Sequence, residues 1–114
     1  MKIYLAVPYT ACLTGDKLRD LDLMTERFDS AAKKTGELLS QGHIVLCPIV
    51  HYHPVAEVCD LPRDWEFWRN IDEALVEWCD ELWVFMLDGW DKSTGIRAEV
   101  EKAERMNIPV RYCR

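Results

Sequence analysis

Two carboxylates in this sequence stand where apolar side chains are expected, and Glu99 is the first of them. Residues 82–106 read as a buried strand, a polar turn and a helix. At 100° per residue, Glu99 falls on the same side of that helix as Ile96 and Ala103. An ionised carboxylate on a core-facing stripe is costly unless it has partners or faces a cavity. Glu99 is therefore a candidate for catalysis or ligand binding.

The second carboxylate is Asp72, in a helix predicted over residues 65–79. The other acidic residues of this segment share one polar face, whereas Asp72 points about 120° away from them, toward Trp65 and Trp68. Both carboxylates also have structural explanations. Asp72 could be a buried hydrogen-bonding group, and Glu99 could form an ion pair with an arginine across a helix contact.

Two carboxyl groups in different environments can cleave the bond between a sugar and a base. One stays ionised and captures the oxocarbenium-like anomeric carbon, while the other protonates the leaving group. We expect Glu99 to be the ionised nucleophile, because a helix N-terminus favours an anion. Asp72 lies beside tryptophans, so desolvation should raise its pKa and suit it to be the acid. Trp65 or Trp68 would stack on the base.

The turn before Glu99 supplies groups for the other end of such a substrate. Ser93, Thr94 and Gly95 offer hydroxyls and free amides at a helix N-terminus, a setting suited to a 5'-phosphate or 5'-hydroxyl. Tyr9 and Thr10, in the loop after the first strand, would hold the same 5' end. The simpler interpretation of Ser93 is a helix cap, and the two roles are compatible.

The remaining segments predict how these residues are positioned. Strands are predicted at residues 2–7, 43–47, 81–86 and 110–113, and a long helix at 18–40. Short connections between them favour right-handed parallel crossovers. We therefore predict an α/β fold: a single doubly wound domain over residues 1–114, flavodoxin-like or Rossmann-like, with about four parallel strands in the order 2-1-3-4. Loops 8–16 and 87–94 would meet at its switch point.

Residues 48–63 show no clear period, and we interpret them as a long functional loop. If this segment is extended, His51 and His53 lie on one face of it. No third ligand with a recognisable spacing accompanies them, so we predict no metal site. Instead, we expect His51 to line the pocket, with ordinary surface packing as the alternative.

Composition limits the partners. The chain has 114 residues and a net charge of -6, which argues against a nucleic-acid polymer and favours a small molecule. Five cysteines without a CxxC pair, and no signal segment, indicate reduced thiols in a cytoplasmic protein. No apolar run approaches the roughly 20 residues of a membrane span, so no membrane partner is expected.

Segments along nearly the whole chain carry a family resemblance: KIYLAVPYT, GHIVLCPIVHYHP, DWEFWRNIDEALVEWCDELWV and DGWDKSTGIRAEVEKA. They resemble a family of small uncharacterised bacterial proteins related to nucleoside 2-deoxyribosyltransferases and deoxyribonucleotide N-hydrolases. Those enzymes have a Ser-x-Gly-x-x-x-Glu-like turn and helix, matched here by Ser93, Gly95 and Glu99, in which the glutamate is the nucleophile. They also have an aspartate eight residues before an acidic residue, matched by Asp72 and Asp80.

The resemblance implies cleavage or transfer at the N-glycosidic bond of a nucleoside or its 5'-monophosphate, by a homodimer or larger homo-oligomer. This chemistry requires no metal and no organic cofactor. Five tryptophans in so small a domain also favour association, because they leave apolar surface to cover. The chain departs from the enzymes at Val7 to Thr10, where they usually have a glycine with Ser or Arg nearby to hold a phosphate. The substrate and the acceptor therefore stay open.

Two other functions fit the same residues. Phosphoribohydrolases that resemble lysine decarboxylases carry Gly-Gly-x-Gly-Thr-x-x-Glu, but Asp91, Lys92 and Ser93 stand in place of their glycines here. A nucleotide-binding sensor or accessory protein without turnover would retain both carboxylates as readily as an enzyme.

Overall fold

One parallel four-stranded sheet, in the order β2-β1-β3-β4, forms the centre of the fold. The computed structural model describes residues 1–114. Its strands are β1 (Lys2–Ala6), β2 (Ile44–Leu46), β3 (Glu81–Phe85) and β4 (Val110–Cys113). The predicted α/β class, doubly wound arrangement and strand order are confirmed.

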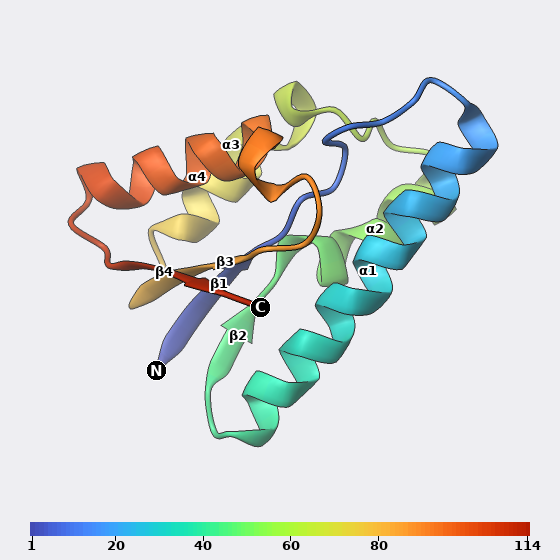
Figure 1. Ribbon diagram of the computed structural model, residues 1–114. Coiled ribbons are helices and arrows are strands. Elements are labelled where there is room, and N and C mark those ends of the chain that lie inside the picture. The colour runs from blue at the N-terminus through green and yellow to red at the C-terminus, as the bar shows by residue number, and fades with distance from the viewer.

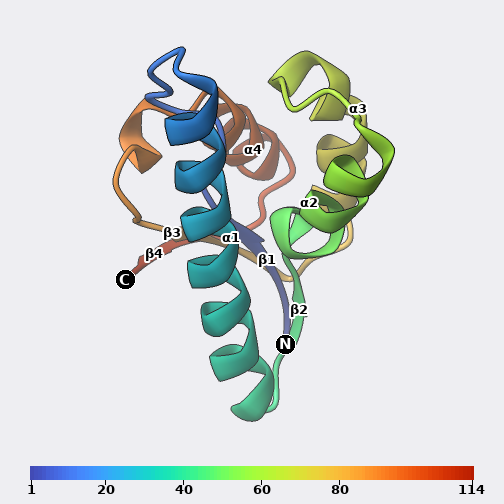
Figure 2. The same cartoon turned by 90° about the vertical axis from the view of Figure 1, so that its right-hand side faces the viewer.

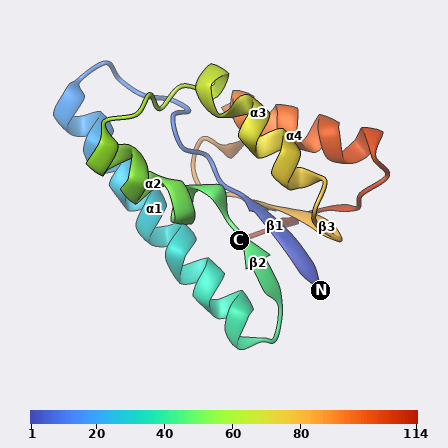
Figure 3. The ribbon, with the colours of Figure 1, turned by 180° about the vertical axis from the view of Figure 1, so that it is seen from behind.

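Helices cover both faces of the sheet. They are α1 (Lys17–Ser40), α2 (Pro48–Cys59), α3 (Trp65–Val76) and α4 (Thr94–Arg105), with a short 3-10 helix, η1 (Trp90–Lys92), before α4. α1 runs along one face with α2 beside it, and α3 and α4 lie together over the other face (Figures 1 and 3). The short connections of this arrangement bring the ends of β1 and β3 together on one side of the molecule.

Alternation along β1 divides the core into two parts. Ile3 and Leu5 pack with the buried residues of α1, whereas Tyr4 and Ala6 pack with those of α3 and α4. Successive side chains of a strand point to opposite faces, so β1 serves both layers. Tyr4 therefore lies on the same side of the sheet as the helices that carry Asp72 and Glu99.

The prediction of a loop over residues 48–63 is wrong, because residues 48–59 form α2. Pro48 stands in the first turn, where its missing N–H costs nothing and its fixed φ suits a helix. The apolar residues of α2 are spread around its axis, and Pro54 lies inside it. An amphipathic stripe is the signal by which a helix is recognised in a sequence, and α2 has none. Contacts with α1 stabilise it instead.

α3 is shorter than predicted, and no side chain caps its N-terminus. It ends at Val76 rather than at residue 79, and the next turn closes with bonds from Trp78 N to Leu75 O and from Cys79 N to Val76 O. Asp64 occupies the N-cap position, but its side chain accepts no capping hydrogen bond. Asp64 lines the cavity described below.

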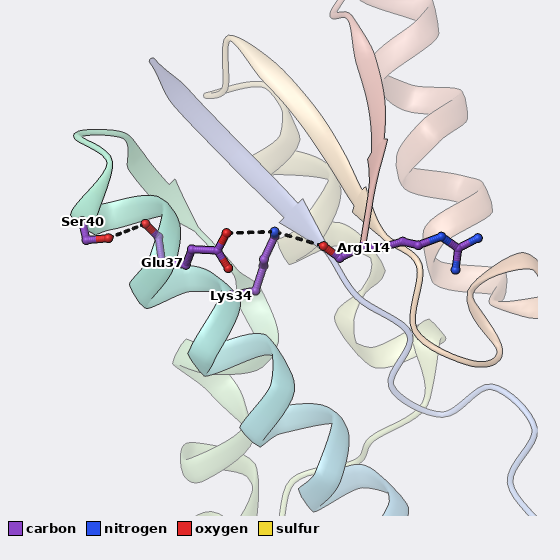
Figure 4. A network of polar contacts seen from close by, with 4 residues as sticks. All are labelled: Lys34, Glu37, Ser40 and Arg114. Carbon is purple, nitrogen blue, oxygen red and sulfur yellow. Dashed lines mark hydrogen bonds and ion pairs between the residues drawn. The ribbon is translucent and has the colours of Figure 1, made fainter.

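The end of β4 is fastened to α1 (Figure 4). Lys34 Nζ lies 3.2 Å from the carbonyl oxygen of Arg114 and 3.4 Å from Glu37 Oε1, and Ser40 Oγ donates to the Glu37 carbonyl at 2.6 Å. Exposed contacts of this kind contribute little free energy each. They nevertheless hold the C-terminal residue against the helix on one face of the sheet.

No helix of the fold combines the length and the apolar character needed to cross a membrane.

Candidate active site

A cavity of about 730 Å³ opens at the carboxyl end of β1. Its walls come from β1, the loop after it, α2, the start of α3, and the turn that leads into α4. Ligands of open α/β sheets bind at this edge, and the volume is within the range of small-molecule sites. Both unusual carboxylates, Asp72 and Glu99, line this cavity.

Glu99 is 5% exposed and contacts the sheet. The hydroxyl of the fully buried Tyr4 donates a hydrogen bond to Glu99 Oε2. Asp72 projects from α3, and its Oδ1 is buried without any hydrogen-bond partner. The structural explanations therefore do not account for either residue: Glu99 bonds a tyrosine rather than an arginine, and Asp72 leaves an oxygen unsatisfied.

Burial perturbs the ionisation of both carboxyl groups. Desolvation raises the pKa of Asp72 to about 7, which agrees with its predicted role as an acid. Desolvation, and then the charge of Asp72, raise the pKa of Glu99 well above its usual range, although the hydrogen bond from Tyr4 opposes this. Two carboxyl groups that interact in this way titrate as a pair. At neutral pH the pair therefore retains protons that ordinary carboxyl groups would lose.

The prediction that the helix N-terminus keeps Glu99 readily ionised is wrong. The helix dipole favours an anion only within the first turn. α4 begins at Thr94, so Glu99 lies beyond that turn, and it is buried beside another carboxyl group. Burial and the charge of Asp72 therefore outweigh the helix dipole and raise the pKa of Glu99.

Tyr4 belongs to the site although the sequence pattern does not single it out. It lies inside an apolar strand, and its burial raises its pKa well above the usual value, with the charge of Glu99 adding to the effect. It therefore stays protonated and acts as a hydrogen-bond donor. The sequence signal that could have identified Tyr4 is the alternation of side chains along β1, which directs Tyr4 and Ala6 toward the layer that holds α4.

The turn before α4 lies in the cavity wall, as Ser93, Thr94 and Gly95 all line the pocket. Ser93 Oγ accepts a bond from Ile96 N at 3.2 Å, so Ser93 is the N-cap of α4 as well as a lining residue. A β-carbon at Gly95 would lie 3.3 Å from the ring of Trp65. Glycine at this position allows Trp65 to pack closely over the start of α4.

Tyr9 and Thr10 also line the cavity, and Arg27 holds their loop in place. Arg27 Nη1 donates to the carbonyl oxygens of Tyr9 (2.9 Å) and Ala11 (2.8 Å), and Nη2 donates to that of Asp88 (3.0 Å). One buried guanidinium thus joins the loops after β1 and β3, which meet as predicted. A helical wheel of α1 places Arg27 with the buried Met24 and Ala31.

We expect Arg27→Met to loosen both loops. Three carbonyl oxygens lose a charged donor, and the free energy of unfolding should fall by about 2 kcal/mol. Amide hydrogen exchange should accelerate in residues 8–16 and 87–93 while the rest of the sheet stays protected. Arg19→Met, at an exposed position of the same helix, is the matched control. Unchanged exchange in both loops would show that Arg27 does not hold them.

Aromatic side chains form one wall of the cavity. Trp65 and Trp68 line it, as predicted, and so does Tyr52 from α2. The rings of Tyr52 and Trp68 lie 5.2 Å apart, and Trp68 Nε1 donates to the carbonyl oxygen of Pro62 at 2.8 Å. These contacts fix the wall across the junction of α2 and α3, both of which are in the right half of Figure 2.

His51 does not line the cavity. It is exposed and packs edge-on against Tyr52, because α2 is a helix and turns His51 away from the face that His53 occupies. His53 is 5% exposed and lines the pocket. Its Nδ1 bonds the hydroxyl of Tyr9 and its Nε2 lies 3.1 Å from Glu57 Oε1. No three His, Cys, Asp or Glu side chains gather in a way that would hold a metal ion.

The fold and the cavity define the class: a doubly wound α/β protein with a buried pair of carboxyl groups at the carboxyl edge of its sheet. The chain belongs to the family described as "Domain of unknown function (DUF1937)", whose model matches residues 1–113. No curated protein matches the chain.

Proposed function

We propose that this protein cleaves or transfers the N-glycosidic bond of a nucleoside or its 5'-monophosphate, with a 2'-deoxyribose as the favoured sugar. The observation that carries the proposal is the carboxyl pair: Glu99 buried against the Tyr4 hydroxyl, and Asp72 with an unpartnered oxygen and a pKa of about 7, in one cavity. The resemblance to nucleoside 2-deoxyribosyltransferases points to the same two residues.

The first half of the reaction breaks the bond between the sugar and the base. In the reactive form the carboxyl pair holds one proton, on Asp72, and Glu99 is ionised. Positive charge that develops at the anomeric carbon favours this form, and the Glu99 carboxylate then forms a bond to that carbon. Asp72 gives its proton to the departing base nitrogen, which takes the electron pair of the broken bond. Tyr4 holds Glu99 in position through its hydrogen bond.

The second half releases the sugar. Water, or a nitrogen of a second base, attacks the anomeric carbon and displaces Glu99, while Asp72 takes up the proton that the attacking group loses. Whether water or a base enters determines whether the enzyme is a hydrolase or a transferase. Ser93, Thr94, Tyr9 and Thr10 line the same cavity and would hold the 5' end of the sugar.

A chromatographic assay for free base tests the proposal. The purified protein is incubated with each 2'-deoxynucleoside and each 5'-monophosphate, with and without a second base. We expect free base from at least one substrate, and a new nucleoside in the presence of the second base if the enzyme is a transferase. Saturable binding without release from any substrate would contradict the proposal and favour a nucleotide-binding sensor.

A further inference from the structure

One side of α3 carries an apolar stripe that the fold leaves at the surface. The stripe consists of four residues at steps of four, three and four along the helix and the turn after it: Phe67, Ile71, Ala74 and Trp78. Phe67 is 41% exposed, Trp78 is 37% exposed, and Ala74 is exposed as well. The core-facing side of α3 is a different one, which carries the fully buried Val76. An exposed apolar patch of this kind is typical of a protein–protein contact.

The two large rings of this α3 stripe are already held in place. The Phe67 ring packs against Trp68, with the centroids 4.9 Å apart, and Lys2 Nζ lies 5.5 Å from the centroid of the Trp78 ring. Ile44 pairs in register with Lys2 and is 59% exposed, so the apolar surface continues onto the edge strand β2. Side chains that are ordered before association lose little conformational entropy when a partner binds.

The order of residues in the α3 stripe points to a second copy of the chain as the partner. The spacing is the same when it is read from either end. A second α3 that packs in the antiparallel direction therefore places its Trp78 against Phe67 and its Ala74 against Ile71. A large ring then meets a large ring, and the branched side chain meets the small one. A two-fold contact requires this property, because the same patch serves on both subunits.

The polar border of the α3 stripe fits the same arrangement. Asn70 and Glu77 are seven residues apart, so they lie on one side of the helix, and both are exposed. In the antiparallel pair, Asn70 of one copy lies across from Glu77 of the other, and an amide N–H₂ donates to a carboxylate. Lys102 Nζ holds the same Glu77 carboxylate at 2.8 Å within one chain. The stripe itself contains no charged residue, so no like charges meet at its centre.

We propose that two copies of this chain associate through their α3 stripes, packed against each other in the antiparallel direction. The side chains of α3 that line the cavity, Trp65, Trp68 and Asp72, lie on another side of the helix. The interface therefore leaves the cavity walls of each copy within that copy, and the proposal does not depend on the proposed function.

Sedimentation of the unchanged protein tests whether the dimer exists. At micromolar concentrations we expect twice the 13.3 kDa mass of one chain. A mass of one chain up to the highest concentration examined would overturn the proposal.

Charged substitutions at Ala74 test whether the α3 stripe is the interface. Ala74 lies near the two-fold axis, so Ala74→Glu brings two carboxylates together, and Ala74→Lys brings two ammonium groups together. Each variant should raise the dissociation constant of the dimer by about thirty-fold or more, the usual effect at the centre of an interface. Leu39→Glu, at an exposed apolar position of α1, is the matched control and should leave the dimer intact.

A mixture of the two Ala74 variants separates lost contacts from lost folding. Opposite charges meet in the mixed pair, so an equimolar mixture of Ala74→Glu and Ala74→Lys should form dimers again although each variant alone sediments as one chain. A misfolded variant would not be rescued in this way. Dimers that persist in both single variants, or a mixture that stays monomeric, would show that the contact lies elsewhere and that the proposal is wrong.

Discussion

Glu99→Gln should lower the rate of base release by about a thousand-fold or more, because an amide cannot form the bond to the anomeric carbon that a carboxylate forms. The affinity for nucleosides should change only a few-fold, since glutamine has a similar shape and still accepts the hydrogen bond from Tyr4. The measurement combines the chromatographic assay with calorimetric titration of the same substrate.

The matched control for this prediction is Glu101→Gln, an exposed position of the same helix, which should keep the full rate. Intact-mass spectrometry of the unchanged protein after rapid quenching should also detect a sugar adduct that Glu99→Gln never forms. Base release that survives in Glu99→Gln would exclude Glu99 as the nucleophile and transfer that role to another group of the cavity.

Asp72→Asn should lower the rate of base release by about 10²- to 10⁴-fold, the usual contribution of a positioned general acid. The pKa of Asp72 is about 7, so the unchanged enzyme should lose kcat/KM as pH rises above that value and the acid loses its proton. The profile of Asp72→Asn should lack this loss. A basic limb that persists in the variant would show that another group supplies the proton.

The same substitution should stabilise the protein at high pH. The pKa of an aspartate is ordinarily 3.8, and that of Asp72 is about 7 in the folded protein, so between these values the folded state binds more protons than the unfolded state. The free energy of unfolding therefore falls as pH rises through this window. A tenfold change in an ionisation constant corresponds to about 1.4 kcal/mol, which makes the cost of ionised Asp72 at most about 4 kcal/mol.

Urea unfolding at pH 4 and pH 8 measures that cost. Asp72→Asn should unfold at a higher urea concentration than the unchanged protein at pH 8. The difference should shrink at pH 4, where Asp72 is protonated in the folded state and close to its titration midpoint in the unfolded state. Asp22→Asn, at an exposed position of α1, should show no such dependence on pH. An equal difference at both pH values would contradict the raised pKa.

Local patterns in the sequence were enough to predict the α/β fold of this protein and to single out Asp72 and Glu99. Runs of β-branched and apolar residues bounded by proline identify the strands, and short connections between strands and helices leave few ways to order a parallel sheet. Asp72 and Glu99 stood out because each breaks a helical stripe. Breaks of this kind are visible without any structure, since helical periodicity is a property of neighbouring residues.

The tertiary structure decided what surrounds that pair. α2 shows no stripe, so its helical state depends on packing, and that state turns His53 rather than His51 into the cavity. Tyr4 and Arg27 join the site from positions remote in sequence from the two carboxylates, and no spacing rule links them. The ionisation of Glu99 also depended on the fold, because burial and the nearness of Asp72 outweigh the helix dipole that the sequence alone suggests. The pKa of a buried carboxyl group depends on all the atoms that exclude water from it, and only the folded chain brings those atoms together.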